Sequence, residues 1–113
     1  EAKEDICFTF SVKPLLKSNN FSSVEGMNLY RTIQEAINNS IKYAQPKNVT
    51  VNIEPDENGI AITIADDGKG FDREMVVMGN GIHNMQKRIQ DIEGDFDLVS
   101  KPNEGTKITI RLT

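Results

Sequence analysis

The sequence predicts a two-layer α/β sandwich, in which a mixed sheet of about five strands is covered on one face by helices. Five short segments alternate apolar and polar residues, which is the pattern of strands with one buried and one solvated face. Two longer segments repeat apolar residues every three or four positions, as amphipathic helices do. The 113 residues are enough for one core and too few for two, so we expect a single domain over 1–113.

The first strand is expected over residues 6–12, where β-branched and aromatic residues stop short of Pro14. The single cysteine, Cys7, lies in this run and is interpreted as a small core residue, because it has no partner for an internal disulfide. A polar connection follows. Ser22 or Ser23 is then placed to cap a long helix.

That first helix is expected over about residues 27–44, where apolar and small residues, Ser40 among them, recur at helical spacing, and Pro46 ends it. Strands at 49–53 and 60–64 then form a hairpin around a polar turn. Residues 66–81 break the periodicity and carry four glycines, so we expect a loop there whose middle moves.

A second helix is expected over residues 82–92, with Gly94 as its C-terminal cap. A closing hairpin pairs residues 96–98 with 108–112 across a polar turn. Because the strands alternate rather than running apolar throughout, only one face of the sheet is expected to be covered.

Composition excludes some classes of partner. The net charge of −4 and the pI near 5.0 argue against a nucleic-acid surface, which needs a clustered basic face. No apolar run is long enough for a membrane span, so no direct membrane contact is expected from this domain. With one cysteine and a start unlike a signal peptide, a reducing, cytoplasmic location is expected.

The first predicted helix carries a polar stripe beside its buried face. At about 100° per residue, Glu35, Asn39 and Lys42 project together. A carboxylate, an amide and an ammonium on one surface suit a metal–triphosphate site, since Mg²⁺ takes oxygen ligands and keeps substrate phosphates. A solvated helix face with an i, i+7 ion pair would show the same spacing. Spacing alone leaves both interpretations open.

Two glycine-containing segments bound the predicted loop. Asp-Asp-Gly-Lys-Gly at 66–70 follows a buried strand, where glycines let the backbone approach a flat ligand and a carboxylate accepts an amino hydrogen bond. Gly-Asn-Gly at 79–81 abuts the second helix, whose free N–H groups form an anion site. An ordinary Asp-Gly turn and a flexible loop entering a helix are the alternatives. Neither the P-loop pattern nor the order of a dinucleotide-binding fold is present.

Taken in order, these segments resemble the boxes of the GHKL ATPase superfamily, and of its histidine-kinase branch in particular. Residues 35–39 resemble the N box, 66–70 the first glycine box, 79–81 the second, and Gly105 with Thr106 the last. The resemblance spans nearly the whole chain and implies the Bergerat fold. The stretch LYRTIQEAINNSIKYA is most similar to kinases whose partners are response regulators with helix-turn-helix output domains.

The resemblance implies a role for each matching residue. Asp66 is expected to recognise the adenine amine, Asn39 to hold Mg²⁺ and Lys42 to meet phosphate. Glu35 is expected either to act as the acid–base residue or to orient the metal shell through water. Tyr43 stands where many relatives have histidine, and its hydroxyl is able to donate to phosphate or ribose. The other nucleotide contacts are expected from Gly68, Gly70, Ile82, Thr106 and the two lid hinges, Gly79 and Gly81.

The implied function is the ATP-binding catalytic domain of a two-component sensor histidine kinase. It would present Mg-ATP to a histidine on a separate dimerisation and phosphotransfer domain, and the kinase would signal to a response regulator. That domain and the sensor domain are expected outside this chain, so the isolated domain is expected to bind ATP with little turnover. The sole histidine, His83, is interpreted as an exposed polar residue and not as the phosphoacceptor.

Two alternatives stay open. One is a serine/threonine protein kinase of the anti-sigma-factor type from the same superfamily, and upstream helices carrying a histidine would distinguish the two. The other is a nucleotide-free module that keeps the fold and binds partners through the cleft or through the Met-Val-Val-Met segment at 75–78. Loss of nucleotide binding would identify that module.

Overall fold

The computed structural model describes residues 5–13, 22–57, 59–70 and 81–112. The elements in chain order are the strand β1 (Cys7–Val12), the helix α1 (Ser23–Asn39), the π-helix η1 (Ser40–Ala44), the strands β2 (Asn48–Asp56) and β3 (Gly59–Asp66), the helix α2 (Gly81–Asp91), and the strands β4 (Asp95–Ser100) and β5 (Thr106–Leu112). The predicted strands and helices are confirmed, with η1 continuing the first predicted helix. No helix in these ranges is both long enough and apolar enough to cross a membrane.

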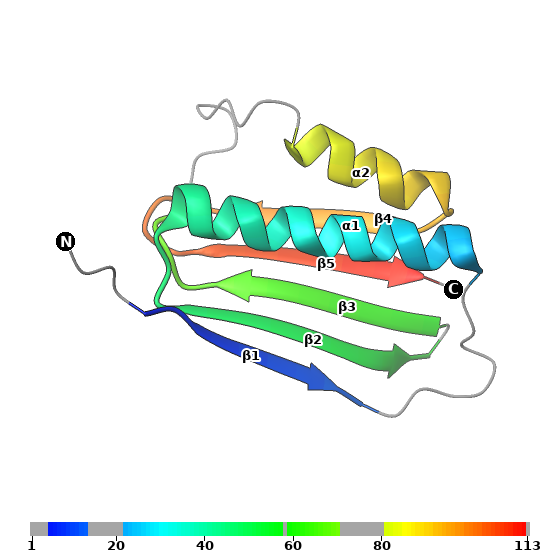
Figure 1. Cartoon of the computed structure of the whole chain (residues 1–113), viewed down its shortest axis with the longest axis horizontal. Helices are drawn as coiled ribbons and strands as arrows, with labels where there is room; N and C mark the ends of the chain where they lie inside the picture. The colour runs from blue at the N-terminus through cyan, green and yellow to red at the C-terminus, as the bar shows by residue number, and fades with distance from the viewer. Residues whose placement is uncertain (1–4, 14–21, 58, 71–80, 113) are drawn as a thin grey trace.

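The strands form one mixed sheet in the order β1-β2-β3-β5-β4. β1 runs parallel to β2, whereas every other neighbouring pair is antiparallel. Both α-helices lie on one face of the sheet, over the side formed by β3, β5 and β4 (Figure 1). This arrangement is the predicted two-layer α/β sandwich.

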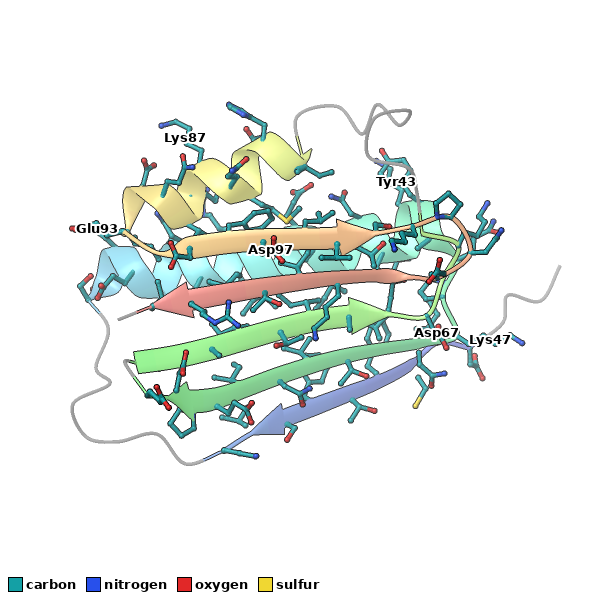
Figure 2. All side chains as sticks on the ribbon, turned by 180° about the vertical axis from the view of Figure 1, so that it is seen from behind. Tyr43, Lys47, Asp67, Lys87, Glu93 and Asp97 are labelled. Carbon is teal, nitrogen blue, oxygen red and sulfur yellow. The ribbon has the colours of Figure 1, made fainter. Side chains whose placement is uncertain are left out.

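The core lies between the two helices and the inward side chains of the strands. The register sets Ile62 of β3 opposite Ile110 of β5, and both are buried. Met85 and Ile89 of α2 belong to the same buried cluster. Burying one side chain of this size is worth about 1.5–3 kcal/mol. The intervening residues face solvent, as Asp97 of β4 does on the uncovered face (Figure 2).

Ser22, rather than Ser23, caps α1. Its hydroxyl accepts the N–H of Glu25 at 3.1 Å, and the Glu25 carboxylate accepts the N–H of Ser22 at 2.8 Å, which completes a capping box. Further along α1, the amide of Asn28 donates to the carbonyl of Arg88 at 3.0 Å. This bond joins α1 to α2 directly.

The prediction that Gly94 caps the second helix is wrong. The left-handed residue after α2 is Glu93, with φ of 60°, at the end of the helix (Figure 2). The N–H of Gly94 donates to the carbonyl of Ile89 and that of Glu93 to the carbonyl of Gln90, each at 2.9 Å, as in a Schellman motif. Gly94 is instead required for space, since a Cβ there would lie 2.8 Å from Ile89 Cγ2 and 3.1 Å from the Arg111 carbonyl oxygen.

β1 also departs from its predicted burial. Cys7 is exposed and not part of the core. Phe8, Phe10 and Val12 lie on the same sheet face as the core residues of β2, yet they are 42%, 61% and 64% exposed. β1 forms one edge of the sheet, and the two α-helices lie over the other side (Figure 1). The alternating pattern therefore predicted the strand correctly, but it did not predict how exposed the side chains of the strand are.

Candidate functional site

A cavity of about 250 Å³ lies between the helices and one end of the sheet. Residues of α1, η1, α2, the loop after β3 and strands β3, β4 and β5 line it. Most of the wall is apolar, with a few polar side chains, which is usual for a small-molecule site. The lining residues are Ala36, Asn39, Ser40, Tyr43, Ala44, Ile64, Ala65, Asp66, Lys69, Gly70, Ile82, Met85, Leu98, Thr106 and Ile108.

The carboxylate of Asp66, at the end of β3, is held from two sides. Its Oδ1 accepts the N–H of Gly68 at 2.8 Å, and its Oδ2 accepts the hydroxyl of Ser40 at 2.8 Å. A carboxylate offers about four lone-pair sites, so it can still accept a hydrogen bond from a ligand. The sequence motif located Asp66, but helical spacing assigned Ser40 to core packing. The only hint in the sequence that Ser40 belongs to the site was its hydroxyl side chain at the position directly after Asn39.

The glycines of the 66–70 segment stand where the loop passes close to other backbone. The N–H of Lys69 donates to the carbonyl of Ala44 at 2.7 Å, and a Cβ at Gly68 would lie 2.6 Å from the Ala44 Cβ. Gly70 has a φ of +63°, and a Cβ there would overlap the Lys101 carbonyl and lie 2.8 Å from the Gly105 carbonyl oxygen. Both glycines therefore let the loop pass close to the chain's own backbone, and Gly70 lines the cavity whereas Gly68 does not.

Asn39 and Glu35 lie side by side against the first residue of α2. A Cβ at Gly81 would lie 3.0 Å from Asn39 Nδ2 and 3.1 Å from Glu35 Oε2. Within the described residues, Nδ2 of Asn39 is buried and has no hydrogen-bond partner. A buried polar atom without a partner needs an explanation, and a bound ligand supplies one. The N-terminus of α2 beside it favours negative charge.

The helix changes type at the site, because residues 40–44 form a π-helical turn. Such a turn is wider than an α-helical one, so each residue advances the rotation less. Lys42 belongs to this turn. Its ammonium lies 5.6 Å from the centroid of the Tyr43 ring, and it does not line the cavity. Tyr43 does line it, with 44% of the residue exposed.

The other predicted residues line the cavity, are exposed on α2, or lie outside the described residues. Ile82 lines the cavity from the first turn of α2, and Thr106 lines it from β5 with its hydroxyl 2.8 Å from that of Ser100. His83 is exposed, as predicted. Gly79 and the Met-Val-Val-Met segment at 75–78 lie outside the described residues.

Asp67 is a structural residue that sequence reasoning did not single out. Its Oδ1 accepts the N–H groups of Lys47 and Asn48, both at 2.9 Å, and its Oδ2 accepts the Asn48 side-chain amide at 2.8 Å. Figure 2 shows Asp67 next to Lys47 where β2 begins. The hydrogen bonds from Asn48, the side-chain one first, lower the pKa of Asp67 below its usual value of 3.8. Asp67 thus anchors the loop that carries Asp66.

The donor set limits which metal can bind. Among the described residues there is no group of three or more His, Cys, Asp or Glu side chains placed to hold a metal ion. Asn39 and Glu35 nevertheless present an amide and a carboxylate side by side. The two ends of the Asn39 amide exchange by a half turn, so its oxygen is able to replace the unpaired nitrogen. Two oxygen donors fit an ion such as Mg²⁺ that keeps water and phosphate ligands.

Comparison with known proteins adds a family match and two groups of relatives. Residues 25–113 match the family described as histidine kinase-, DNA gyrase B- and HSP90-like ATPase. The chain is 34% identical over 101 residues to the signal transduction histidine-protein kinase/phosphatase DegS of Brevibacillus brevis. It is 36% identical over 84 residues to the sensor protein VraS of Staphylococcus epidermidis. These matches cover 88% and 74% of this chain but 26% and 24% of the relatives, so the chain spans about a quarter of their length.

Solved structures share the fold. The histidine kinase domain of the blue-light activated histidine kinase EL346 from Erythrobacter litoralis matches with a TM-score of 0.76 and 15% identity, over 93% of this chain and 50% of that one. The ATP binding domain of PrrB from Mycobacterium tuberculosis matches with a TM-score of 0.67 and 22% identity, over 93% and 79%. At these identities the likeness concerns the fold alone, and it confirms the predicted α/β sandwich.

Proposed function

The chain belongs to the family of histidine kinase-, DNA gyrase B- and HSP90-like ATPases, and we propose that it is the ATP-binding catalytic domain of a two-component sensor histidine kinase. The observation that carries this proposal is one cavity whose wall holds both the Asp66 carboxylate and Asn39, whose Nδ2 is buried and has no hydrogen-bond partner among the described residues. The relatives DegS and VraS, named as a histidine-protein kinase/phosphatase and a sensor protein, support the kinase assignment.

The cavity accounts for each part of a nucleotide. The apolar wall offers a surface for the purine ring, and Asp66 accepts a hydrogen bond from the adenine amine. Asn39 and the start of α2 at Gly81 receive the phosphates, because free N–H groups and the helix dipole favour anions there. Tyr43 lines the cavity and would donate its hydroxyl to ribose or phosphate. Lys42, which is exposed on the adjacent turn, would bind the outer phosphate.

Magnesium would bind between the protein and the phosphates. Asn39 would hold it directly, and Glu35 would either orient its water shell or serve as the acid–base residue. The ion supplies charge neutralisation on the transferring phosphoryl group. The protein's own contribution is to place ATP in the cavity.

The acceptor histidine is expected on a helical domain of the parent protein, because the kinase resemblance implies a separate domain and the chain spans about a quarter of its relatives' length. The parent would then pass the phosphoryl group to a response regulator. Since ATP is the donor, the domain is expected to work in the cytoplasm. Alone, it is expected to bind ATP with little turnover.

The test is phosphorylation of the full-length parent protein with ATP labelled on the γ-phosphate. We expect label in an acid-labile, alkali-stable bond, as a phosphorylated histidine gives, and we expect Asn39→Ala to abolish it. Asn38→Ala is the matched control, because Asn38 is the exposed neighbour of the same type. Label in an acid-stable ester on serine or threonine would contradict the proposal and favour the anti-sigma-factor type of kinase.

A further inference from the structure

We propose that Ser40 is a positioning residue, whose hydroxyl orients the Asp66 carboxylate so that the site takes a 6-aminopurine in preference to a 6-oxopurine. This inference rests on the proposed nucleotide function of the cavity. It adds a second residue to the selection of the base, one that acts through Asp66 and not by its own contact with the ligand.

Ser40 is unusual for its burial and for its partner. It is 6% exposed, and the only other buried polar residue in the described part of the chain is Thr32. Its Oγ lies 2.8 Å from Asp66 Oδ2, and both residues line the cavity. From the opposite side, the N–H of Gly68 donates to Asp66 Oδ1 at 2.8 Å. Each carboxylate oxygen is therefore tied by a donor from a different segment.

The Ser40 hydroxyl does not serve its own helix. A serine or threonine inside a helix commonly donates to the carbonyl four residues earlier, and Thr32 does this with Asn28 at 2.8 Å. Ser40 donates instead to a residue 26 positions away in sequence. It is also the first residue of η1, where the wider turn begins. Its hydroxyl thus connects the helix to the end of β3 at the cavity wall.

This arrangement gives the carboxylate one chemical preference. Two fixed donors prevent rotation about its Cβ–Cγ bond, and an ionised carboxylate can only accept hydrogen bonds from a ligand. An amino group at purine position 6 donates to it, whereas an oxo group would set oxygen against oxygen. A mismatch of this kind is expected to cost about 10-fold to 100-fold in affinity.

Removal of the hydroxyl should weaken that preference. In Ser40→Ala the carboxylate keeps only the Gly68 donor, so it is free to turn and its lone pairs no longer point in one direction. We expect ATP affinity to fall about 3-fold to 10-fold, and the ratio of ATP to inosine triphosphate affinity to fall by about the same factor, because inosine triphosphate has no hydrogen bond to this carboxylate to lose. A purely structural bond would lower stability without changing this ratio.

The experiment is calorimetric titration of ATP and of inosine triphosphate, each with magnesium, into the 113-residue chain and three variants. Ser40→Ala removes the hydroxyl, Ser40→Thr restores it, and Thr32→Val removes the other buried hydroxyl of the helix as the matched control. Thermal unfolding without nucleotide measures the structural effect of each change. If Ser40→Ala does not fold, Ser40→Cys, of similar volume and a weak donor, takes its place.

We expect the ATP preference to fall in Ser40→Ala, to return in Ser40→Thr and to be unchanged in Thr32→Val. Wild-type preference in Ser40→Ala, or an equal fall in Thr32→Val, would overturn the role of Ser40 while leaving the nucleotide function intact. Failure of the wild-type chain to bind either nucleotide would overturn both.

Discussion

At the scale of single residues, Asp66 and Asp67 are adjacent carboxylates with separate partners. Asp66 accepts hydrogen bonds from Ser40 and Gly68 and lines the cavity. Asp67 accepts them from the start of β2 and does not line it. One carboxylate is thus available to a ligand, while the other holds the loop in place.

The lowered pKa of Asp67 predicts that the domain loses stability in acid. Because the pKa of Asp67 is lower in the folded state, the unfolded chain binds the proton first as the pH falls. The stabilisation by Asp67 is therefore fully present above pH 3.8 and is lost as the pH falls through the folded-state pKa. The contribution is small, since the side chain is exposed. Thermal unfolding from about pH 6 to about pH 3 should show a steeper loss in the wild type than in Asp67→Asn. Equal slopes would mean that Asp67 is not anchored in solution.

The sequence located part of this site and not the rest, for reasons of geometry. Asp66 and Asn39 were predictable, since each lies in a motif bounded by a regular element. The contact of Ser40 was not, because Ser40 begins the π-helical turn, and periodicity at α-helical spacing assumes that no such turn occurs. The partner of Ser40 lies 26 residues away, beyond the reach of local pattern.

At the scale of elements, two glycines have opposite roles. Gly26 lies inside α1, and a Cβ there would meet nothing within 4 Å. Gly105 begins the approach to β5 with a φ of +79°, and a Cβ there would overlap the Asp66 carbonyl. Of these two, it is Gly105 whose conformation and surroundings require glycine.

Gly26→Ala should therefore stabilise the domain by about 0.5–1 kcal/mol, because alanine loses less backbone freedom in a helix. Urea unfolding followed by circular dichroism measures the change. A lower midpoint in the variant would show that this part of α1 contacts something that the described residues do not include.

Gly105→Ala should destabilise by about 1–3 kcal/mol, because it combines a left-handed backbone with loss of space beside Asp66. The same urea measurement applies, with Gly26→Ala as the internal comparison. A cost near zero would indicate that the turn between β4 and β5 relaxes freely.

Helices and strands were predictable from the sequence where apolar residues recur at a regular spacing. The contacts that each helix or strand makes with its neighbours were not predictable. The alternation in β3 and β5 and the helical repeat of α2 gave the correct structures, since each buries one face. The capping role of Gly94 and the burial of Cys7 failed. The burial of Cys7 depends on which elements lie over β1, an edge strand, whereas the left-handed position after α2 falls on Glu93, one residue earlier than predicted.

At the scale of the whole molecule, the cavity joins both layers of the sandwich. Its wall takes residues from α1, η1, α2 and the strands, so a bound nucleotide would contact elements of both layers. A ligand that binds only the folded state stabilises it by mass action. At a concentration about 100 times its dissociation constant, Mg-ATP should add about 2.7 kcal/mol.

Differential scanning calorimetry with rising Mg-ATP checks this expectation. The unfolding temperature should increase with the logarithm of nucleotide concentration, and magnesium alone should leave it nearly unchanged. No increase with Mg-ATP would favour a module that keeps the fold without its ligand.

The whole-molecule account requires the base to bind at Asp66, and one calorimetric titration tests this most directly. Mg-ATP is titrated into the wild-type chain, Asp66→Asn and the matched control Asp67→Asn, each confirmed to be folded. Loss of a charge-assisted acceptor should weaken binding about 10-fold to 100-fold in Asp66→Asn, while Asp67→Asn should bind like the wild type. No binding by the wild type, or equal affinity in both variants, would contradict the account.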